Sequence, residues 1–210
     1  PAVAMLISHF IMALYLMFNL QLKQKIIKLT PCSISLGSFK DIMKVGGGGL
    51  INSITIAGTV AVVTAAVSKH GVEALAGYGL GSRLEIIITP LVFGIGSVLT
   101  ASVGINVGAQ QLPRAKMIAW TGAFISFCVV GLLGATVTIF PDIWLNNFES
   151  STLIRDYATS YLIIVAPFYC FFAAGQTLYF ASQGLGKIFY PVIVGIIRLL
   201  SVSIICYYIC

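Results

Sequence analysis

Uncharged polar side chains recur at helical spacing within long apolar stretches of this 210-residue sequence. Polar groups in an apolar setting are costly unless they meet a partner or a wet cavity. Three of them are three and four residues apart and share one face of a helix: Asn52, Thr55 and Thr59. Three more are seven residues apart and share a face of a second helix: Tyr169, Gln176 and Gln183. Each stripe is a candidate wall for the path of a small molecule, and equally a candidate for hydrogen bonds between helices.

Three charged residues adjoin or enter the apolar stretches: Arg83, Glu85 and Arg198. Glu85 is the acid nearest to the interior of a stretch, so it is a candidate carrier of a proton or cation, or a charge that pairs with another helix. Arg83 lies two residues before it, and residues two apart on a helix do not face each other, so we expect no local ion pair. Arg198 interrupts the last stretch and needs an acceptor, which a carbonyl at a kinked helix or Glu85 could supply.

The sequence offers no arrangement for enzymatic or metal chemistry. None of the five cysteines forms a CxxC pair, and His9 and His70 lie near no cysteine. The glycine-rich stretch 77–81 follows no β-strand and precedes no P-loop lysine, so we interpret it as a flexible external turn. We therefore expect a protein that is not an enzyme and that holds no metal or cofactor.

Helices that cross a membrane must position these residues. Hydrophobic residues make up 59% of the sequence and charged residues 9%, with a mean hydropathy of +1.02. Soluble domains carry about 25% charged residues, so the composition excludes a soluble globule, a nucleic-acid-binding protein and a secreted disulfide scaffold. The sequence predicts an all-α, polytopic transmembrane bundle. Its six expected spans are residues 2–20, 45–67, 84–107, 117–140, 157–181 and 188–209.

The loops between the expected spans alternate in charge. Formal charges in residues 21–44, 108–116 and 182–187 amount to +4, +2 and +1, whereas the second and fourth loops carry 0 and −2. Cytoplasmic loops of membrane proteins are rich in Lys and Arg. We therefore expect these three loops in the cytoplasm and the Pro1 end outside, in the inner or plasma membrane of a cell. The lipid bilayer, rather than a nucleic acid, is the partner that this charge pattern indicates.

Glycine and proline interrupt the expected spans. Residues 46–49 are four glycines that open the second span, Pro90 lies early in the third, and Pro167 lies midway along the fifth. Membrane helices tolerate such residues where neighbours or water satisfy the freed backbone groups, and in transporters they often mark hinges and substrate sites. Close packing or a static kink explains them equally well.

Two shorter patterns concern the helix ends. Ser38 followed by Asp41 is typical of a helix start, so we expect a short helix along the cytoplasmic surface before the second span. Gly104 and Gly108 form a GxxxG pattern, which favours close packing of helices.

Three segments, in this order and spacing, resemble the multidrug and toxic compound extrusion (MATE) family. They are EALAGYGLGSRLE at 73–85 followed by Pro90, GINVGAQ at 104–110 through Arg114, and QGLGK at 183–187 before Pro191. The resemblance implies a twelve-helix fold of two six-helix lobes, of which this chain matches helices six to eleven. Residues 1–22 would then be the last helix of an amino-terminal lobe, 23–44 a cytoplasmic inter-lobe linker, and 45–210 five helices of the carboxy-terminal lobe. On this mapping the chain is partial, and the rest of the amino-terminal lobe is its missing partner.

The resemblance also implies a function. Family members are antiporters that export cationic or amphipathic compounds by alternating access, driven by H⁺ or Na⁺ and without a cofactor. Sodium-coupled members place acids in helices seven and ten; here those positions fall near Thr55 or Ile56 and on Ala173, while the nearby tyrosine is matched by Tyr169. Because neither acid is present, the chain is also similar to the branch whose cation site lies in the amino-terminal lobe. Both H⁺ and Na⁺ stay open as the coupling ion.

Two other functions are kept as alternatives to export. A flippase for lipid-linked saccharides, from the same superfamily, would need a more cationic groove for a pyrophosphate headgroup, and Arg198 is the residue that would contribute to it. A non-transporting membrane scaffold or insertion factor would need neither the kinked helices nor the polar stripes.

The loop charges make a testable prediction about orientation. In variants that keep one cysteine each, a membrane-impermeant thiol reagent applied to intact cells should modify a cysteine introduced at Asn146 and should not modify Cys32. The basic first loop holds Cys32 in the cytoplasm, whereas the acidic fourth loop holds position 146 outside. The opposite labelling pattern would contradict the predicted orientation.

Overall fold

The computed structural model describes residues 2–19, 36–148 and 151–209. Two compact units are present, Pro1–Asp41 and Ile42–Cys210. The first unit contains helix α1 (Ala2–Phe18), an apolar helix shorter than the other spans. Most of the linker expected at 23–44 lies outside the described residues.

Five segments of the chain are long and apolar enough to cross a membrane: Gly46–Ser68, Val72–Gly108, Leu112–Ile139, Thr152–Gly184 and Phe189–Tyr208. Together with α1 they correspond in order to the six expected spans. The described residues are helical with no strand among them, which confirms the predicted all-α transmembrane class.

Helix α2 (Leu36–Ser68) passes without a break through the four glycines at 46–49. The expectation of a separate short helix before this span is wrong, because the helix begins at Leu36 and continues directly into the span. Each glycine lowers helix propensity by about 1 kcal/mol relative to alanine, but it keeps its N–H group, so the hydrogen-bond ladder continues.

Helices α3 (Val72–Ser82) and α4 (Leu84–Gly108) follow each other with only Arg83 between them. Arg83 has helical torsion angles, with φ −59° and ψ −21°. The third span is therefore longer than expected, because it takes in residues assigned to a loop from their charges. Pro90 lies inside α4, which continues past it.

The glycine-rich stretch 77–81 lies within α3, so its interpretation as an external turn is wrong. Gly77 and Gly81 are buried and lie against α7 (Thr152–Val165). A Cβ atom on Gly77 would come 2.5 Å from Tyr157 Cβ, and one on Gly81 would overlap the ring of Tyr161. Two glycines four residues apart thus give α3 a smooth face on which α7 packs, as small residues do between membrane helices.

A short 3₁₀ turn, η2 (Ala166–Phe168), separates α7 from α8 (Tyr169–Gly184) and contains Pro167. Proline lacks an amide hydrogen and its ring crowds the preceding turn, so it often breaks a helix, as it does here. Helix α5 (Leu112–Ile139) approaches this break closely, since a Cβ on its Gly134 would collide with the carbonyl oxygen of Ala166. The interruption expected at Pro167 is confirmed. The interruption also expected at Pro90 is absent, because α4 accommodates that proline and runs through it.

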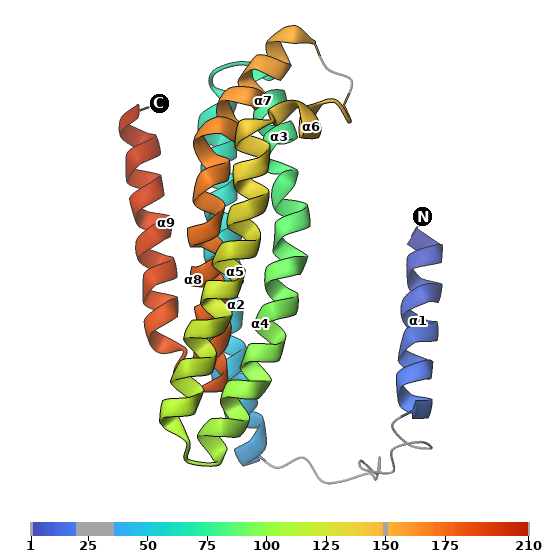
Figure 1. The fold of residues 1–210 in the computed structure, drawn as a ribbon, viewed down its shortest axis with the longest axis vertical. Coiled ribbons are helices and arrows are strands. Elements are labelled where there is room, and N and C mark those ends of the chain that lie inside the picture. The colour runs from blue at the N-terminus through green and yellow to red at the C-terminus, as the bar shows by residue number, and fades with distance from the viewer. Residues whose placement is uncertain (1, 20–35, 149–150, 210) are drawn as a thin grey trace. The chain divides into compact units, whose positions relative to one another are not determined.

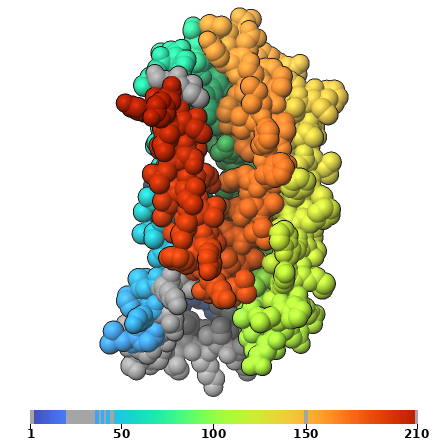
Figure 2. Space-filling model, turned by 90° about the vertical axis from the view of Figure 1, so that its left-hand side faces the viewer, coloured from blue at the N-terminus to red at the C-terminus, as the bar shows by residue number. Residues whose placement is uncertain are grey.

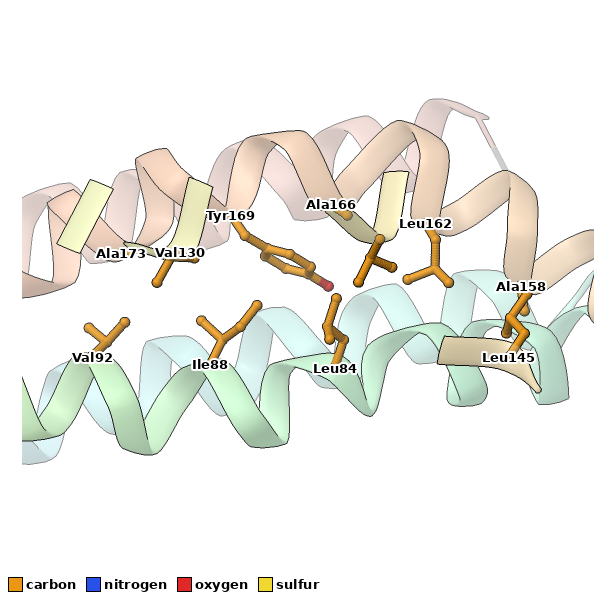
Figure 3. Packing of buried hydrophobic residues seen from close by; sticks show 11 residues of the cluster. Leu84, Ile88, Val92, Val130, Leu145, Ala158, Leu162, Ala166, Tyr169 and Ala173 are labelled. Atoms are coloured by element: carbon orange, nitrogen blue, oxygen red, sulfur yellow. The ribbon is translucent and has the colours of Figure 1, made fainter. Parts of the chain in front are cut away.

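Helices α4, α5 and α8 pack on one another at the centre of the second unit, and α3 packs on α7 (Figure 1). The main apolar core lies between α4 and the α7–α8 pair (Figure 3). Its α4 residues are four apart and occupy one face of the helix: Leu84, Ile88 and Val92. They meet buried residues from the other side of the core: Leu162, Ala166, Tyr169 and Ala173.

Helices α2 and α9 (Phe189–Ile209) touch each other at a few small residues. A Cβ on Gly58 would lie 3.3 Å from Leu199 Cδ1, and a Cβ on Gly195 would lie 3.0 Å from Thr55 Oγ1. Figure 2 shows α9 in red beside α7 and α8 in orange, with a hollow between them.

The GxxxG pattern contributes to packing through one of its glycines. Gly104 meets the backbone of α8 at Gly184: a Cβ on Gly184 would lie 3.2 Å from Gly104 N and 2.5 Å from Thr100 O. The packing role is confirmed for Gly104, whereas a Cβ on Gly108 would meet no atom of another described helix within 4 Å.

This close contact predicts the effect of adding one methyl group. Gly184→Ala should lower the free energy of unfolding by about 1–3 kcal/mol, because the backbone of α4 must move to admit the new Cβ. Denaturation with SDS in mixed micelles, followed by circular dichroism, measures the change. The control Gly108→Ala should leave stability unchanged or raise it by up to about 1 kcal/mol. Equal effects of the two substitutions would contradict the packing described here.

Candidate functional site

The carboxylate of Glu85 meets two tyrosine hydroxyls that come from other helices. Glu85 lies in the first turn of α4. Tyr169 Oη of α8 donates to Glu85 Oε1 at 3.1 Å, and Tyr161 Oη of α7 approaches the same oxygen at 3.4 Å. The two hydroxyl oxygens are 3.2 Å apart. These three residues, which we call the acid–tyrosine cluster, join three helices at one point.

The break at Pro167 and the small residue Gly81 allow both tyrosines to reach Glu85. Residues eight apart on a regular helix point about 80° away from each other, but η2 lies between Tyr161 and Tyr169 and changes their relative direction. Gly81 leaves room for the ring of Tyr161, since any Cβ there would overlap it. The ring of Tyr169 lies between α8 and α4 with its hydroxyl directed toward α4 (Figure 3).

Glu85 also lines a groove between α2, α3 and α4 with a volume of about 760 Å³. Sites for small organic molecules typically measure about 300–1,000 Å³, so this groove has the size for one. Its polar lining includes Thr64 from α2 and Tyr78 from α3. Tyr78 also packs edge to face on Tyr161, with 5.4 Å between ring centroids. The acid–tyrosine cluster therefore forms part of the groove wall.

Arg83 and Glu85 point to different neighbours. The Arg83 guanidinium lies 5.4 Å from the centre of the Phe148 ring, a cation–π contact. The described residues contain no ion pair between Arg83 and Glu85, as the two-residue spacing predicted; the ion pair they do contain joins Arg155 to Asp142.

Two residues of the first stripe, Asn52 and Thr55, lie on the side of α2 that faces α9, and Thr59 follows one turn after Thr55. Asn52 and Thr55 are only 9% and 3% exposed. Thr55 Oγ1 donates to the Asn52 carbonyl at 2.8 Å, and Thr59 Oγ1 donates to the Thr55 carbonyl at 2.7 Å. The shared face is confirmed. Its part in a substrate path stays a prediction.

The three residues of the second stripe, Tyr169, Gln176 and Gln183, lie in three different environments along α8. Tyr169 belongs to the acid–tyrosine cluster. Gln176 is buried, and its amide makes no hydrogen bond with the described residues. Gln183 donates to Tyr179 Oη at 2.9 Å within the same helix. The structure thus brings Tyr169 together with Glu85 and leaves the two glutamines apart from them.

Arg198 does not have the partner that we expected for it. Within the described parts of the chain it makes no ion pair and no hydrogen bond, and its Nε atom is buried without an acceptor. Pairing with Glu85 is absent because α9 packs on α2, whereas the Glu85 carboxylate points to α7 and α8.

Sequence reasoning missed Tyr161 and Tyr78. Tyr161 lies eight residues before Tyr169, which is no regular helical interval, and Pro167 changes the geometry between them. Tyr78 lies seven residues before Glu85, so its spacing was an available signal that was not used. A usable signal was the glycine Gly81, because a small residue four positions before Glu85 leaves space beside it for a large ring from another helix.

Known proteins that are similar to the chain agree on its family. The MatE family model matches residues 50–209. A curated relative named "Probable multidrug resistance protein NorM", from Thermotoga maritima, is 26% identical over 201 residues, which are 94% of this chain and 43% of the relative. Another, named "FAD transporter", from Shewanella oneidensis, is 29% identical over 122 residues, which are 56% of this chain and 27% of the relative. The chain thus matches less than half the length of either relative. No solved structure matches the chain significantly.

The acid–tyrosine cluster predicts energetic coupling between α4 and α8. In a double-mutant cycle, Glu85→Gln and Tyr169→Phe should show an interaction of about 1.5–3 kcal/mol in the free energy of unfolding, the range for hydrogen bonds to charged groups. Tyr179→Phe is a matched control on the same helix, and with Glu85→Gln it should be additive within about 0.5 kcal/mol. Additivity of the first pair would show that the contact contributes nothing to stability.

Proposed function

The chain belongs to the MatE family, and on that premise we propose that it forms part of a cation-coupled antiporter that exports cationic or amphipathic compounds by alternating access. The observation that carries the proposal is a carboxylate, Glu85, held by two tyrosines on the wall of a groove beside membrane-spanning helices. Acids in such positions are costly to keep and commonly mark ion or proton pathways. The Thermotoga relative is named a probable multidrug resistance protein, which supports a cargo of drug-like compounds.

The acid–tyrosine cluster can link protonation to the positions of helices. While Glu85 is ionised, it accepts hydrogen bonds from α7 and α8 and holds both helices to α4. A proton on Glu85 removes the negative charge and weakens these bonds. The break at Pro167 lies between the two tyrosines, so α7 can change its angle to α8 at this point. A proton that binds one arrangement more strongly shifts the population toward it.

Either H⁺ or Na⁺ is chemically compatible with the cluster. One carboxylate and two phenolic oxygens can take up a proton, and they are also oxygen ligands of the kind that hard cations prefer. The two positions where the family resemblance would place acids lie elsewhere: Ala173 is in the apolar core, and Thr55 faces α9. Among the described residues, Glu85 is therefore the acid that we assign to coupling.

We also propose that the protein lies in the inner or plasma membrane with its basic loops in the cytoplasm. The basic connections between α4 and α5 and between α8 and α9 lie at the same end of the second unit (Figure 1). Arg114 and Lys116 adjoin the first connection, and Lys187 lies in the second. A common end for the basic loops supports the positive-inside orientation.

Replacing one oxygen of Glu85 tests the coupling role. Glu85→Gln changes the shape very little but removes the titratable group, so the variant should still bind a cationic compound such as ethidium. In proteoliposomes with an imposed pH or Na⁺ gradient, gradient-driven ethidium transport should fall by at least about tenfold, which corresponds to losing about 1.4 kcal/mol of coupling. Binding is measured by fluorescence anisotropy and transport by the change in dye fluorescence.

The matched control is Glu73→Gln, the same substitution at an exposed position in the first turn of α3. It should leave both binding and gradient-driven transport unchanged. Undiminished transport by Glu85→Gln would assign coupling to another part of the protein, such as an amino-terminal lobe. Absence of gradient-driven transport in the unsubstituted protein would contradict the proposed export function itself.

A further inference from the structure

A second groove runs along α5 and shares no lining residue with the groove beside Glu85. It has a volume of about 620 Å³, and its walls come from the second half of α5 and from the segment around Pro167. On α5 the lining begins at Phe127, just past the middle of the helix, and ends at Ile139, the last helical residue. The twelve residue steps between these two positions cover about 18 Å. The groove therefore extends from near the centre of this span to one of its ends.

Small residues on α5 leave the space for this groove. Gly131 lets α8 come close, since a Cβ there would lie 3.3 Å from Cys170 Cβ. Ala135, one turn later, contributes only a methyl group to the lining. At the deep end, the ring of Phe127 packs edge to face on Phe171 of α8, with 5.4 Å between the ring centroids. The groove thus has walls that are held in place by contacts between α5 and α8.

The lining of this groove offers a ligand little beyond apolar contact. Thr138 Oγ1 donates to the Gly134 carbonyl at 2.8 Å, and Cys170 Sγ donates to the Pro167 carbonyl at 3.1 Å. None of the described lining residues carries a charge. Sites for drug-like compounds combine apolar walls with a few polar groups that fix the orientation of the ligand. The groove beside Glu85 has such groups, whereas this one favours a ligand made of hydrocarbon.

The width of the groove favours a single chain over another helix. Leu132, Ala135 and Ile139 are exposed, so the groove opens on the surface of the described bundle. Its volume, spread over a length of about 18 Å, gives a mean cross-section of about 34 Å², which is that of a cylinder about 7 Å wide. A helix with its side chains is about 10–12 Å wide. The groove therefore admits an extended hydrocarbon chain along its length and excludes the backbone of a helix.

From these observations we propose that the groove binds one acyl chain of a membrane phospholipid, in the leaflet that surrounds the Ile139 end of α5. Helix α5 is long and apolar enough to cross a membrane. The hydrocarbon core of a bilayer is about 30 Å thick, so the chains of one leaflet cover about 15 Å, from the centre to one surface. The groove covers the same range of depth. A chain inside it touches α5 and α8 along its whole length, and such dispersion contacts add up. The inference concerns lipid binding and does not depend on the export function.

Photo-crosslinking tests the site on the intact protein in phosphatidylcholine nanodiscs. The probe is a phosphatidylcholine with a diazirine in one acyl chain, added at increasing mole fraction, and mass spectrometry of peptides locates the adducts. Adducts at residues 127–139 and 167–170 should saturate, because a single site fills, whereas adducts elsewhere on the spans should rise in proportion to the probe. Ala135→Phe places a ring in the groove and should lower the adducts at 127–139 by about fivefold or more at low mole fraction. Thr136→Phe, at the next position and outside the lining, is the matched control and should leave them within about twofold.

Competition with unlabelled lipids tests which part of the phospholipid is recognised, and it needs no substituted protein. Phosphatidylglycerol and phosphatidylcholine should displace the probe equally, within about twofold, because no charged residue among the described ones lines the groove. A preference of more than about tenfold for one headgroup would overturn the assignment to the acyl chain. Adducts in the groove that rise in proportion to the probe would show an ordinary lipid-facing surface, and a groove without adducts would show that another protein segment covers it. Either result would overturn the proposal.

Discussion

The close approach of the α3–α4 segment to the α7–α8 segment is the constraint on which the rest of the second unit depends. In a bilayer, helices do not associate to escape water, so contact between them needs small residues and internal hydrogen bonds. Gly77 and Gly81 supply the small residues, and Glu85 with its two tyrosines supplies the bonds. The helix break at Pro167 lies between Tyr161 and Tyr169 in the chain. It allows Tyr161 to pack on Gly81 and Tyr169 to point toward α4. The contact that holds these helices together therefore also forms the acid–tyrosine cluster.

The amino-acid sequence is sufficient to predict the helical class, the order of the spans and the interruption at Pro167. Apolar length sets the spans, and proline, which lacks an amide hydrogen, favours a break at Pro167. The same rule also predicted an interruption at Pro90, where α4 continues. The shared face of Asn52, Thr55 and Thr59 follows in the same way from helical geometry. The interpretation of residues 77–81 was wrong, because we took their glycines as the sign of a turn. In a membrane helix, glycine keeps its backbone hydrogen bond and can form a contact surface. Residues 77–81 are helical here, and their glycines pack on the neighbouring helix α7.

The acid–tyrosine cluster lay beyond prediction because it depends on distances between helices that are far apart in the sequence. Tyr161 and Glu85 are 76 residues apart, and Tyr169 and Glu85 are 84 apart. The polar stripe on α8 included Tyr169 but grouped it with two glutamines whose surroundings differ. The same limit explains Arg198: its charge in an apolar helix indicated a partner, and the position of α9 against α2 removed Glu85 from the possible acceptors.

Helix α2 connects the two polar regions of the second unit, because it forms a wall of each. Val60 and Thr64 line the groove that contains Glu85, whereas Thr55 and Gly58 meet α9 beside Arg198. One region therefore presents a carboxylate and the other a guanidinium, on different sides of the same helix. Since α2 lines the groove and also contacts α9, a displacement of α2 would change both regions together. Such a shared wall is a physical route by which a change at Glu85 can alter the contact between α2 and α9.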